Sequence, residues 1–266
     1  MASNYRIYLA LPGPAFPVPV LDAAYSGSKL HTMLKKNNPS SAWDGFNALW
    51  ADALNETKNG FTHFAMLHAD VLPLEGVPWV DVLIGEMDRL SADLVSTTIA
   101  IKDLRGLTSS GIGDPNDHWA PLKRFTVRET LDLPETFNAA DAGFPGHALL
   151  HNQGCFVADL RSPVFHKTNP DGSLAVYFNF PRRVMRAGVD APWIVQGESE
   201  DWFFSREFHE CGGKGYLTRK VHIQHGGSLD YDNFTPWGTY MNGDENTAAK
   251  WKTVKVESSV AEPNQG

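Results

Sequence analysis

Short apolar runs alternate with stretches of helical spacing through the first hundred residues, and this alternation limits the fold more than any other feature. The runs at residues 5–11, 61–67 and 93–101 have the length of buried strands. Between them, apolar residues recur at helical spacing over residues 41–60 and 80–90. Strand, helix, strand, helix, strand is typical of a sheet covered by helices. We therefore expect an α/β fold with a mixed, mostly parallel central sheet.

A proline-rich stretch follows the first of these runs. Residues 12–19 include four prolines, which end the strand and predict a stiff loop rather than an immediate helix. Open α/β sheets bind ligands at the carboxyl ends of their strands. We expect this loop to border a binding site.

The second half of the chain gives weaker signals. Residues 107–119 are rich in glycine and polar residues and predict a long loop. Further along, strand and helix patterns return at residues 151–158, 200–211 and 216–223. From residue 242 onward the chain is polar and lacks apolar periodicity. We expect one domain over residues 1–241 and a polar tail over residues 242–266.

Charge and composition exclude several classes of protein. The formal net charge is −8, which argues against broad binding to nucleic acid. No apolar run approaches the roughly 18 to 20 residues of a membrane-spanning helix, and the N-terminus lacks the pattern of a secretory signal. The two cysteines, Cys155 and Cys211, fit neither a disulfide framework nor a metal motif. These features predict a cytoplasmic protein without a membrane span.

The tripeptide His68-Ala69-Asp70 stands at the end of a predicted strand. Residues two apart on an extended chain point to the same side, so His68 and Asp70 can approach one ligand together. A carboxylate suits a hard divalent cation, and an imidazole suits Mn²⁺ better than Ca²⁺. The same residue types are also common turn formers at strand ends, so the tripeptide alone leaves a structural interpretation open.

Two further groups of residues can carry chemistry. Glu200 and Asp201 open a predicted helix, where a carboxylate can accept a proton from an attacking hydroxyl or simply stabilise the helix dipole. His225 follows the last predicted strand and precedes two glycines, which let a ligand approach the backbone closely.

Taken in order, these features resemble a known family. They are the proline-containing loop near residue 12, His68-Ala69-Asp70, Gly154-Cys155-Phe156, Glu200-Asp201-Trp202-Phe203-Phe204-Ser205-Arg206 and His225-Gly226. The set resembles the GT-A class of nucleotide-sugar-dependent glycosyltransferases, over about residues 5–227. The resemblance implies a single Rossmann-like GT-A domain.

The resemblance also implies roles for individual residues. His68 and Asp70 would stand where the family's Asp-x-Asp motif binds Mn²⁺ or Mg²⁺ and the donor diphosphate, with His replacing the first Asp. His225 would complete the metal shell. Asp201 would be the catalytic base of an inverting enzyme, and Glu200 would support it or contact the acceptor. The remaining donor-binding positions implied are Leu11, Pro12 and Ala69.

The function expected from this resemblance is transfer of a sugar, UDP-sugar favoured, to a hydroxyl acceptor. The acceptor stays open between a saccharide, a small molecule and a modified nucleic acid base. Two alternatives remain. The first is a catalytically silent nucleotide-sugar-binding protein, which His68 favours because it replaces one member of the usual acidic pair. The second is a metal-dependent phosphoester or sugar-nucleotide hydrolase that uses His68, Asp70 and His225.

Overall fold

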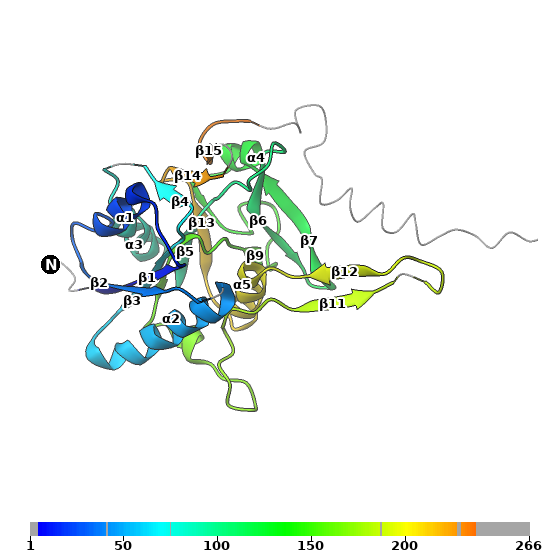
Figure 1. Cartoon of the computed structure of the whole chain (residues 1–266), viewed down its shortest axis with the longest axis horizontal. Coiled ribbons are helices and arrows are strands. Elements are labelled where there is room, and N and C mark those ends of the chain that lie inside the picture. The colour runs from blue at the N-terminus through cyan, green and yellow to red at the C-terminus, as the bar shows by residue number, and fades with distance from the viewer. Residues whose placement is uncertain (1–4, 41, 75, 187, 228–229, 238–266) are drawn as a thin grey trace, which may run out of the picture.

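A seven-stranded sheet forms the centre of the protein in the computed structural model, which describes residues 5–40, 42–74, 76–186, 188–227 and 230–237 (Figure 1). Its strands lie in the order β2-β1-β3-β10-β5-β13-β8. Their bounds are Thr32–Asn38 (β2), Arg6–Pro12 (β1), His63–Leu67 (β3), Cys155–Asp159 (β10), Leu94–Thr97 (β5), Gly215–Thr218 (β13) and Thr136–Phe137 (β8).

The strand directions confirm a mixed sheet but correct the expectation that it is mostly parallel. β1 runs parallel to both β2 and β3, and β13 runs parallel to β5. β10 runs antiparallel to both of its neighbours, β3 and β5, and β8 runs antiparallel to β13. Half of the pairings are therefore antiparallel. Two of them arise because β10, a strand from later in the chain, inserts into the middle of the sheet, and the third is that of the edge strand β8.

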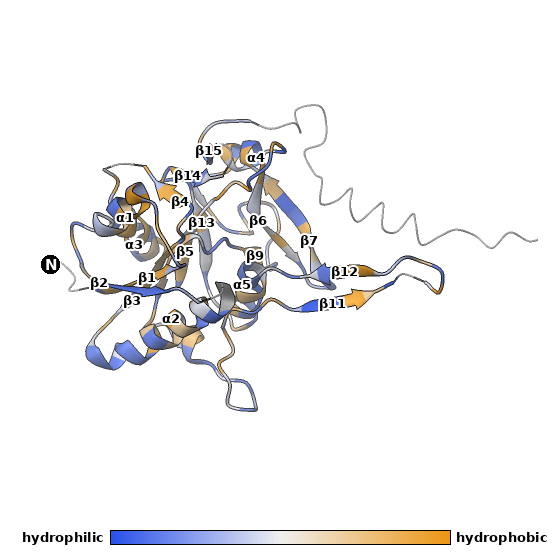
Figure 2. Ribbon diagram, viewed as in Figure 1, coloured by the Kyte–Doolittle hydropathy of each residue, from blue (hydrophilic) through white to orange (hydrophobic). Residues whose placement is uncertain are grey.

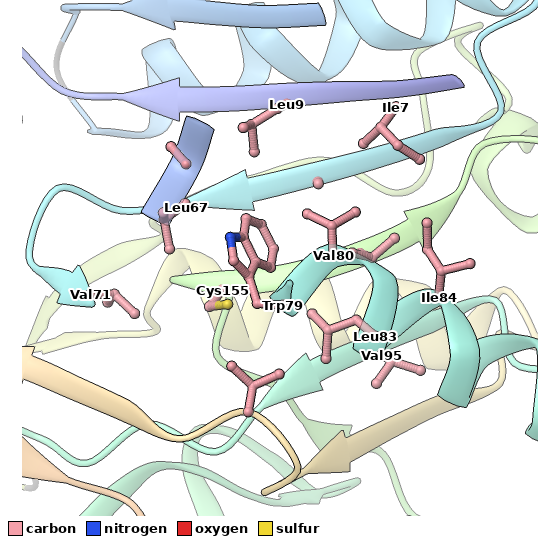
Figure 3. Close-up of a cluster of buried hydrophobic side chains, with 14 of the residues drawn as sticks. Ile7, Leu9, Leu67, Val71, Trp79, Val80, Leu83, Ile84, Val95 and Cys155 are labelled. Carbon is pink, nitrogen blue, oxygen red and sulfur yellow. The ribbon is translucent and has the colours of Figure 1, made fainter. Parts of the chain in front are cut away.

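Helices α1 (Val18–Tyr25) and α3 (Trp79–Leu90) cover one face of this sheet. Alternate residues of the strands point toward them, so Ile7 and Leu9 of β1 share a cluster with Trp79 and Leu83 of α3 (Figure 3). This packing follows from the alternating pattern of strand side chains and the 3.6-residue period of the helices.

Helices α2 (Ala42–Glu56) and α5 (Glu200–Glu210) cover the opposite face. The intervening β1 residues Tyr8 and Ala10 pack there against Trp50 of α2 and Phe204 of α5. Trp50 is 1% exposed, and its indole Nε1 donates to the carbonyl of Val176 at 3.0 Å. The molecule is thus a three-layer α/β structure, as expected from the sequence.

The proline-rich stretch is shorter than predicted. The chain is irregular only to residue 17, and α1 begins at Val18 with Pro19 in its first turn. Proline is tolerated there because the first helical N–H groups have no intrahelical acceptor. The sequence interpretation took the prolines of this stretch to forbid an immediate helix and so missed α1. It also missed the following edge strand β2.

The prediction of a long loop over residues 107–119 is wrong. These residues form most of a hairpin of β6 (Leu107–Asp114) and β7 (Asp117–Thr126), which pairs with β9 (Leu149–Leu150). Its glycines gave it the composition of a loop, yet Gly111 is needed because a Cβ there would collide with the carbonyl of Lys123. Helix α4 (Val127–Asp132) follows, opened by Thr126 and Glu129 as a capping box.

Two smaller sheets complete the described chain. β4 (Val71–Pro73), β14 (Ile223–Gly226) and β15 (Asp230–Asp232) form one of them beside the end of β3. β11 (Arg182–Met185) and β12 (Ile194–Gly197) form a two-stranded hairpin that projects from the body (Figure 1).

Two further sequence predictions concern a membrane-spanning helix and the polar tail. Within the described residues, no helix has the length and apolar character needed to span a bilayer. The predicted tail, residues 242–266, lies outside the described residues.

Candidate functional site

The carboxyl edge of the sheet brings together segments from distant parts of the chain. Cys155, the first residue of β10, pairs with Leu67, the last residue of β3. Thr218 at the end of β13 lies beside Thr97 at the end of β5. The residues that follow β3, β5 and β13 and those that precede β10 therefore meet at one edge.

A cavity of about 640 Å³ opens at this edge. Its walls are the proline-rich loop from Pro12 to Pro17, the turn before α2, Phe46 of α2 and the tripeptide that follows β3. Most of this lining is apolar, and Asp70 is the one acidic residue that the structure places in it. This lining suits a largely apolar group with a charged group next to it.

His68 is held rigidly in the wall of this cavity. Its backbone N–H donates to the carbonyl of Gly154 at 2.8 Å, and its ring stacks on Phe46 with centroids 4.9 Å apart. Burial lowers the pKa of His68 to about 4, so the imidazole is neutral near pH 7. Its Nε2 has no hydrogen-bond partner among the described residues.

Asp70 lies between two basic side chains at the carboxyl edge of the sheet. Its Oδ2 accepts a short hydrogen bond from Nζ of Lys102, which follows β5, and lies 3.6 Å from Nε2 of His225 on β14. Burial alone would raise the pKa of Asp70, but His225 and Lys102 outweigh it and hold that pKa well below its usual range. Asp70 and His225, two of the three metal ligands predicted from the sequence with His68, thus lie side by side, and their role as metal ligands stays a prediction.

The local hydrogen bonds orient His225 for a ligand. Its Nδ1 donates to the carbonyl of Ala100 at 2.7 Å, and its Nε2 faces Oδ2 of Asp70 at 3.6 Å. A backbone acceptor on the far nitrogen is the usual outer partner of a metal-binding histidine.

Asp70 and His225 are the two side chains at this edge that could hold a divalent cation. Asp70 offers a carboxylate oxygen and His225 an imidazole nitrogen 3.6 Å apart, a donor set that suits Mn²⁺. No group of three His, Cys, Asp or Glu side chains among the described residues is arranged to hold a metal. Substrate phosphates and water would therefore have to supply the remaining ligands, as is common for Mg²⁺, and Lys102 would have to leave Oδ2.

Asp201 lies in the first turn of α5, after the N-cap residue Ser199. It is 8% exposed, and its carboxylate accepts from Nδ2 of Asn152 at 3.0 Å and from the backbone N–H of Gln153 at 3.3 Å. The Gln153 amide, oriented with its nitrogen toward Asp201, donates to Oδ1 at 2.7 Å. Burial raises the pKa of Asp201 well above its usual value, and the charge of Glu200 adds to this rise.

Glu200 is half-buried, and burial raises the pKa of this carboxyl as well. Asp201 and Glu200 do not line the 640 Å³ cavity. They connect to it through residues 152–154, because Asn152 and Gln153 hold Asp201 while the carbonyl of Gly154 holds the backbone of His68. Residues 152–154 thus connect the pair Glu200 and Asp201 to the tripeptide that contains His68, but the two groups do not line the same cavity.

The two residues predicted for the donor base have different environments. Pro12 lines the cavity, and so does Ala69. Leu11 is 5% exposed and belongs to the hydrophobic cluster under α1 and α3. Leu11 therefore supports the loop from below rather than lining the cavity.

The sequence interpretation missed several residues of this site. Lys102 was visible only as the first residue of an apparently irregular region, and Asn152 and Gln153 were assigned to a strand. A lysine directly after a predicted strand, at the edge that carries an aspartate, was the available signal for Lys102.

The similarities of the chain to known proteins are to solved structures. No family model matches the chain, and no curated protein matches it. Among solved structures, A197 from STIV has a TM-score of 0.44 and 13% identity, with 86% of this chain and 90% of that chain covered. A UDP-glucose pyrophosphorylase mutant from Leishmania major has a TM-score of 0.41 and 12% identity, with 82% and 62% covered.

A putative glucose-1-phosphate thymidylyltransferase from Bacillus anthracis gives a TM-score of 0.32 and 8% identity, with 62% of this chain and 76% of that chain covered. The chain spans less than two thirds of the length of the pyrophosphorylase. These likenesses concern the course of the backbone alone.

Proposed function

We propose that the protein is a glycosyltransferase that moves a sugar from a nucleotide diphosphate donor, UDP-sugar favoured, to a hydroxyl acceptor. One observation carries this proposal: Asp70 lines a cavity of about 640 Å³ and lies 3.6 Å from His225, which comes from a distant part of the chain. A preformed pair of metal-ligand type beside a largely apolar cavity suits a nucleotide whose phosphates need neutralising.

The donor would lie with its base and ribose among the prolines of the cavity and its diphosphate near Asp70. Lys102, with a side chain 34% exposed, can turn from Asp70 toward the phosphates. Asp70 and His225 would hold Mn²⁺ or Mg²⁺, and a bound cation would neutralise charge on the leaving diphosphate.

Asp201 is the proposed base. A carboxylate whose pKa is raised by burial accepts a proton more readily than an exposed aspartate does, and the amides of residues 152 and 153 fix its orientation. The acceptor hydroxyl loses its proton to Asp201 as its oxygen bonds to the anomeric carbon. The bond from that carbon to the diphosphate oxygen breaks, and the nucleoside diphosphate leaves with the electron pair.

The test is release of nucleoside diphosphate from a panel of nucleotide sugars with Mn²⁺, with and without acceptors. Asp70→Ala is expected to weaken donor binding and lower transfer by more than a hundredfold. Asp201→Asn is expected to lower kcat by at least as much while leaving donor binding unchanged. Asp132→Asn, a change at an exposed carboxylate ending α4, serves as the matched control.

Full activity in both site variants would refute the assignment. Nucleotide release independent of any acceptor would favour the hydrolase. The burial of Asp201 outside the cavity lining favours the silent binding protein instead. Tight donor binding without turnover on every acceptor would establish that alternative.

A further inference from the structure

The hairpin of β11 and β12 carries a face of unusual composition. We call residues 182–197 the arm. Among the described residues, eight large hydrophobic side chains are exposed, and the arm holds four of them: Val184 (65%), Val189 (77%), Trp193 (65%) and Val195 (70%). A small part of the chain thus carries half of the exposed apolar side chains, and scattered single exposures do not explain this concentration.

The register of the hairpin places these residues on one face. Val184 pairs with Val195, and Arg182 pairs with Gly197. Because strand side chains alternate between faces, Arg182, Val184, Trp193 and Val195 point to the same side, and each of them is exposed. This outer face alternates arginine and valine along β11. It continues across to Val195 on β12 and to Trp193, the residue before β12.

The opposite face of the arm turns toward the body. Arg183 lies over the ring of Trp119 on β7 at 4.4 Å and donates to Oε1 of Gln196 at 2.9 and 2.7 Å. Met185 and Ile194, on the same side as Arg183, are only partly exposed. The arm is therefore braced on its inner face, which leaves the outer face open.

The charge of the arm is opposite to that of the rest of the chain. Residues 182–197 contain three arginines and one aspartate, whereas the whole chain has a formal net charge of −8. Arg186 lies over the ring of Trp193 at 4.8 Å, and Arg182 lies over the ring of Phe180 at 4.2 Å. Basic groups beside exposed aromatic and aliphatic side chains match an interface with an anionic headgroup layer above an apolar layer.

We propose that the outer face of the arm docks on an anionic phospholipid bilayer. Figure 1 shows the hairpin projecting beyond the body, so it can touch a flat surface while the acidic body stays away from it. Figure 2 shows the apolar outer halves of β11 and β12 continuing from hydrophilic segments nearer the body. Val189 and Trp193 would enter the interface, and the arginines would contact lipid phosphates.

Two other occupants suit the arm less well. In a symmetric contact between two copies, face against face, Arg182 and Arg186 of both arms would come together, and like charges repel. A nucleic acid would need cationic contacts along its backbone. The outer face instead alternates arginines with valines, which have no group that binds a phosphate. The bilayer uses both the charged and the apolar members of the face.

The test is flotation of the purified full-length chain with vesicles of phosphatidylcholine alone and with 30% phosphatidylserine. We expect binding to the anionic vesicles only, weakened at high salt. The double variant Arg182→Gln/Arg186→Gln is expected to lower the partition coefficient by about thirtyfold. The double variant Trp193→Ala/Val195→Ser is expected to lower it by about tenfold or more.

Leu30→Ser provides the matched control, because Leu30 is 75% exposed but lies outside the arm. It should bind anionic vesicles as the unaltered chain does. A circular-dichroism spectrum of each variant checks that it is folded. A second readout is quenching of tryptophan emission by brominated lipid, which should fall in Trp193→Phe if this ring enters the acyl region.

Several results would overturn the proposal. One is the absence of binding to anionic vesicles, and another is equal loss of binding in Leu30→Ser. A dimer that dissociates in Trp193→Ala/Val195→Ser, without vesicle binding, would assign the arm to a second copy. Arm-dependent binding to an oligonucleotide, without vesicle binding, would assign it to nucleic acid. None of these outcomes bears on sugar transfer, because the proposal does not rest on the proposed function.

Discussion

Replacing Glu86 by glutamine tests how the sheet is fixed to its covering helix. Glu86 of α3 has a side chain only 6% exposed, and its carboxylate accepts from Arg89 at 2.6 Å, from Nζ of Lys220 at 2.6 Å and from Oγ1 of Thr136 at 2.6 Å. Lys220 follows β13, and Thr136 lies on β8. One carboxylate therefore joins α3 to the last two strands of the sheet.

The pKa of Glu86 sets the size of the effect. Burial alone would raise this pKa, but the hydrogen bonds from Arg89, Lys220 and Thr136 lower it from 4.5 to about 2. A shift of this size corresponds to ~3 kcal/mol of folding free energy at neutral pH. The side chains of Arg89 (54% exposed) and Lys220 (36% exposed) keep much of their hydration when the carboxylate is lost, so we expect about 2 kcal/mol in the variant.

The sign of the pH dependence follows from the direction of this shift. The folded-state pKa lies below the unfolded value, so the stabilisation is fully present above about pH 5 and is lost as the pH falls through about 2. Glu86→Gln should lower the free energy of unfolding in urea at pH 7 by about 2 kcal/mol, and Tm by roughly 4–8 °C. The difference should shrink to about half near pH 3.

Asp132→Asn is the control, since an exposed carboxylate at the end of α4 should change the urea midpoint little at either pH. Equal urea midpoints for Glu86→Gln and the unaltered chain at pH 7 would refute the reasoning. A difference that stays constant from pH 7 to pH 3 would show that packing, not charge, produces the effect.

Three further predictions concern the candidate site. Lys102→Gln removes the ammonium group that contacts Asp70. Calorimetry should therefore show about tenfold tighter Mn²⁺ binding and weaker nucleotide binding. Unchanged affinities would contradict the proposal that Lys102 and the cation compete for Asp70. In Gly154→Ala the new Cβ would lie 2.8 Å from Oδ1 of Asn152. The free energy of unfolding in urea should fall by about 1–3 kcal/mol. An unchanged urea midpoint would mean that the segment moves to accommodate the methyl group. Asn152→Ala removes a donor to the ionised Asp201, so the acidic limb of the pH–rate profile should move to higher pH; an unmoved limb would exclude Asp201 as the titrating group.

The sequence was sufficient for the parts of the fold that depend on local periodicity. The alternation over the first hundred residues correctly predicts β1, α2, β3, α3 and β5, because each has one buried face or is buried on both sides. It could not predict that β10 enters between β3 and β5 in the opposite direction, since strand direction is set by tertiary pairing rather than by residue pattern.

The neighbours within the candidate site were predictable only in part. Asp70 and His225 were both identified from residue type and position at strand ends, and they lie close together. Lys102 and Asn152 were missed, because a charged or amide side chain in an irregular segment has no periodic pattern to mark it. Their roles become visible only when the pairing of distant strands fixes the neighbours of Asp70 and Asp201.

The place of β5 in the sheet has a consequence for how the chain folds during synthesis. Both strands that flank β5, β10 and β13, come later in the sequence. When residue 100 leaves the ribosome, β5 has neither of its native hydrogen-bonding partners, and it must wait about sixty residues for the first. Closing such long loops is slow, so the nascent chain should expose an unpaired apolar strand until its C-terminal half arrives, and chaperones have the opportunity to bind there.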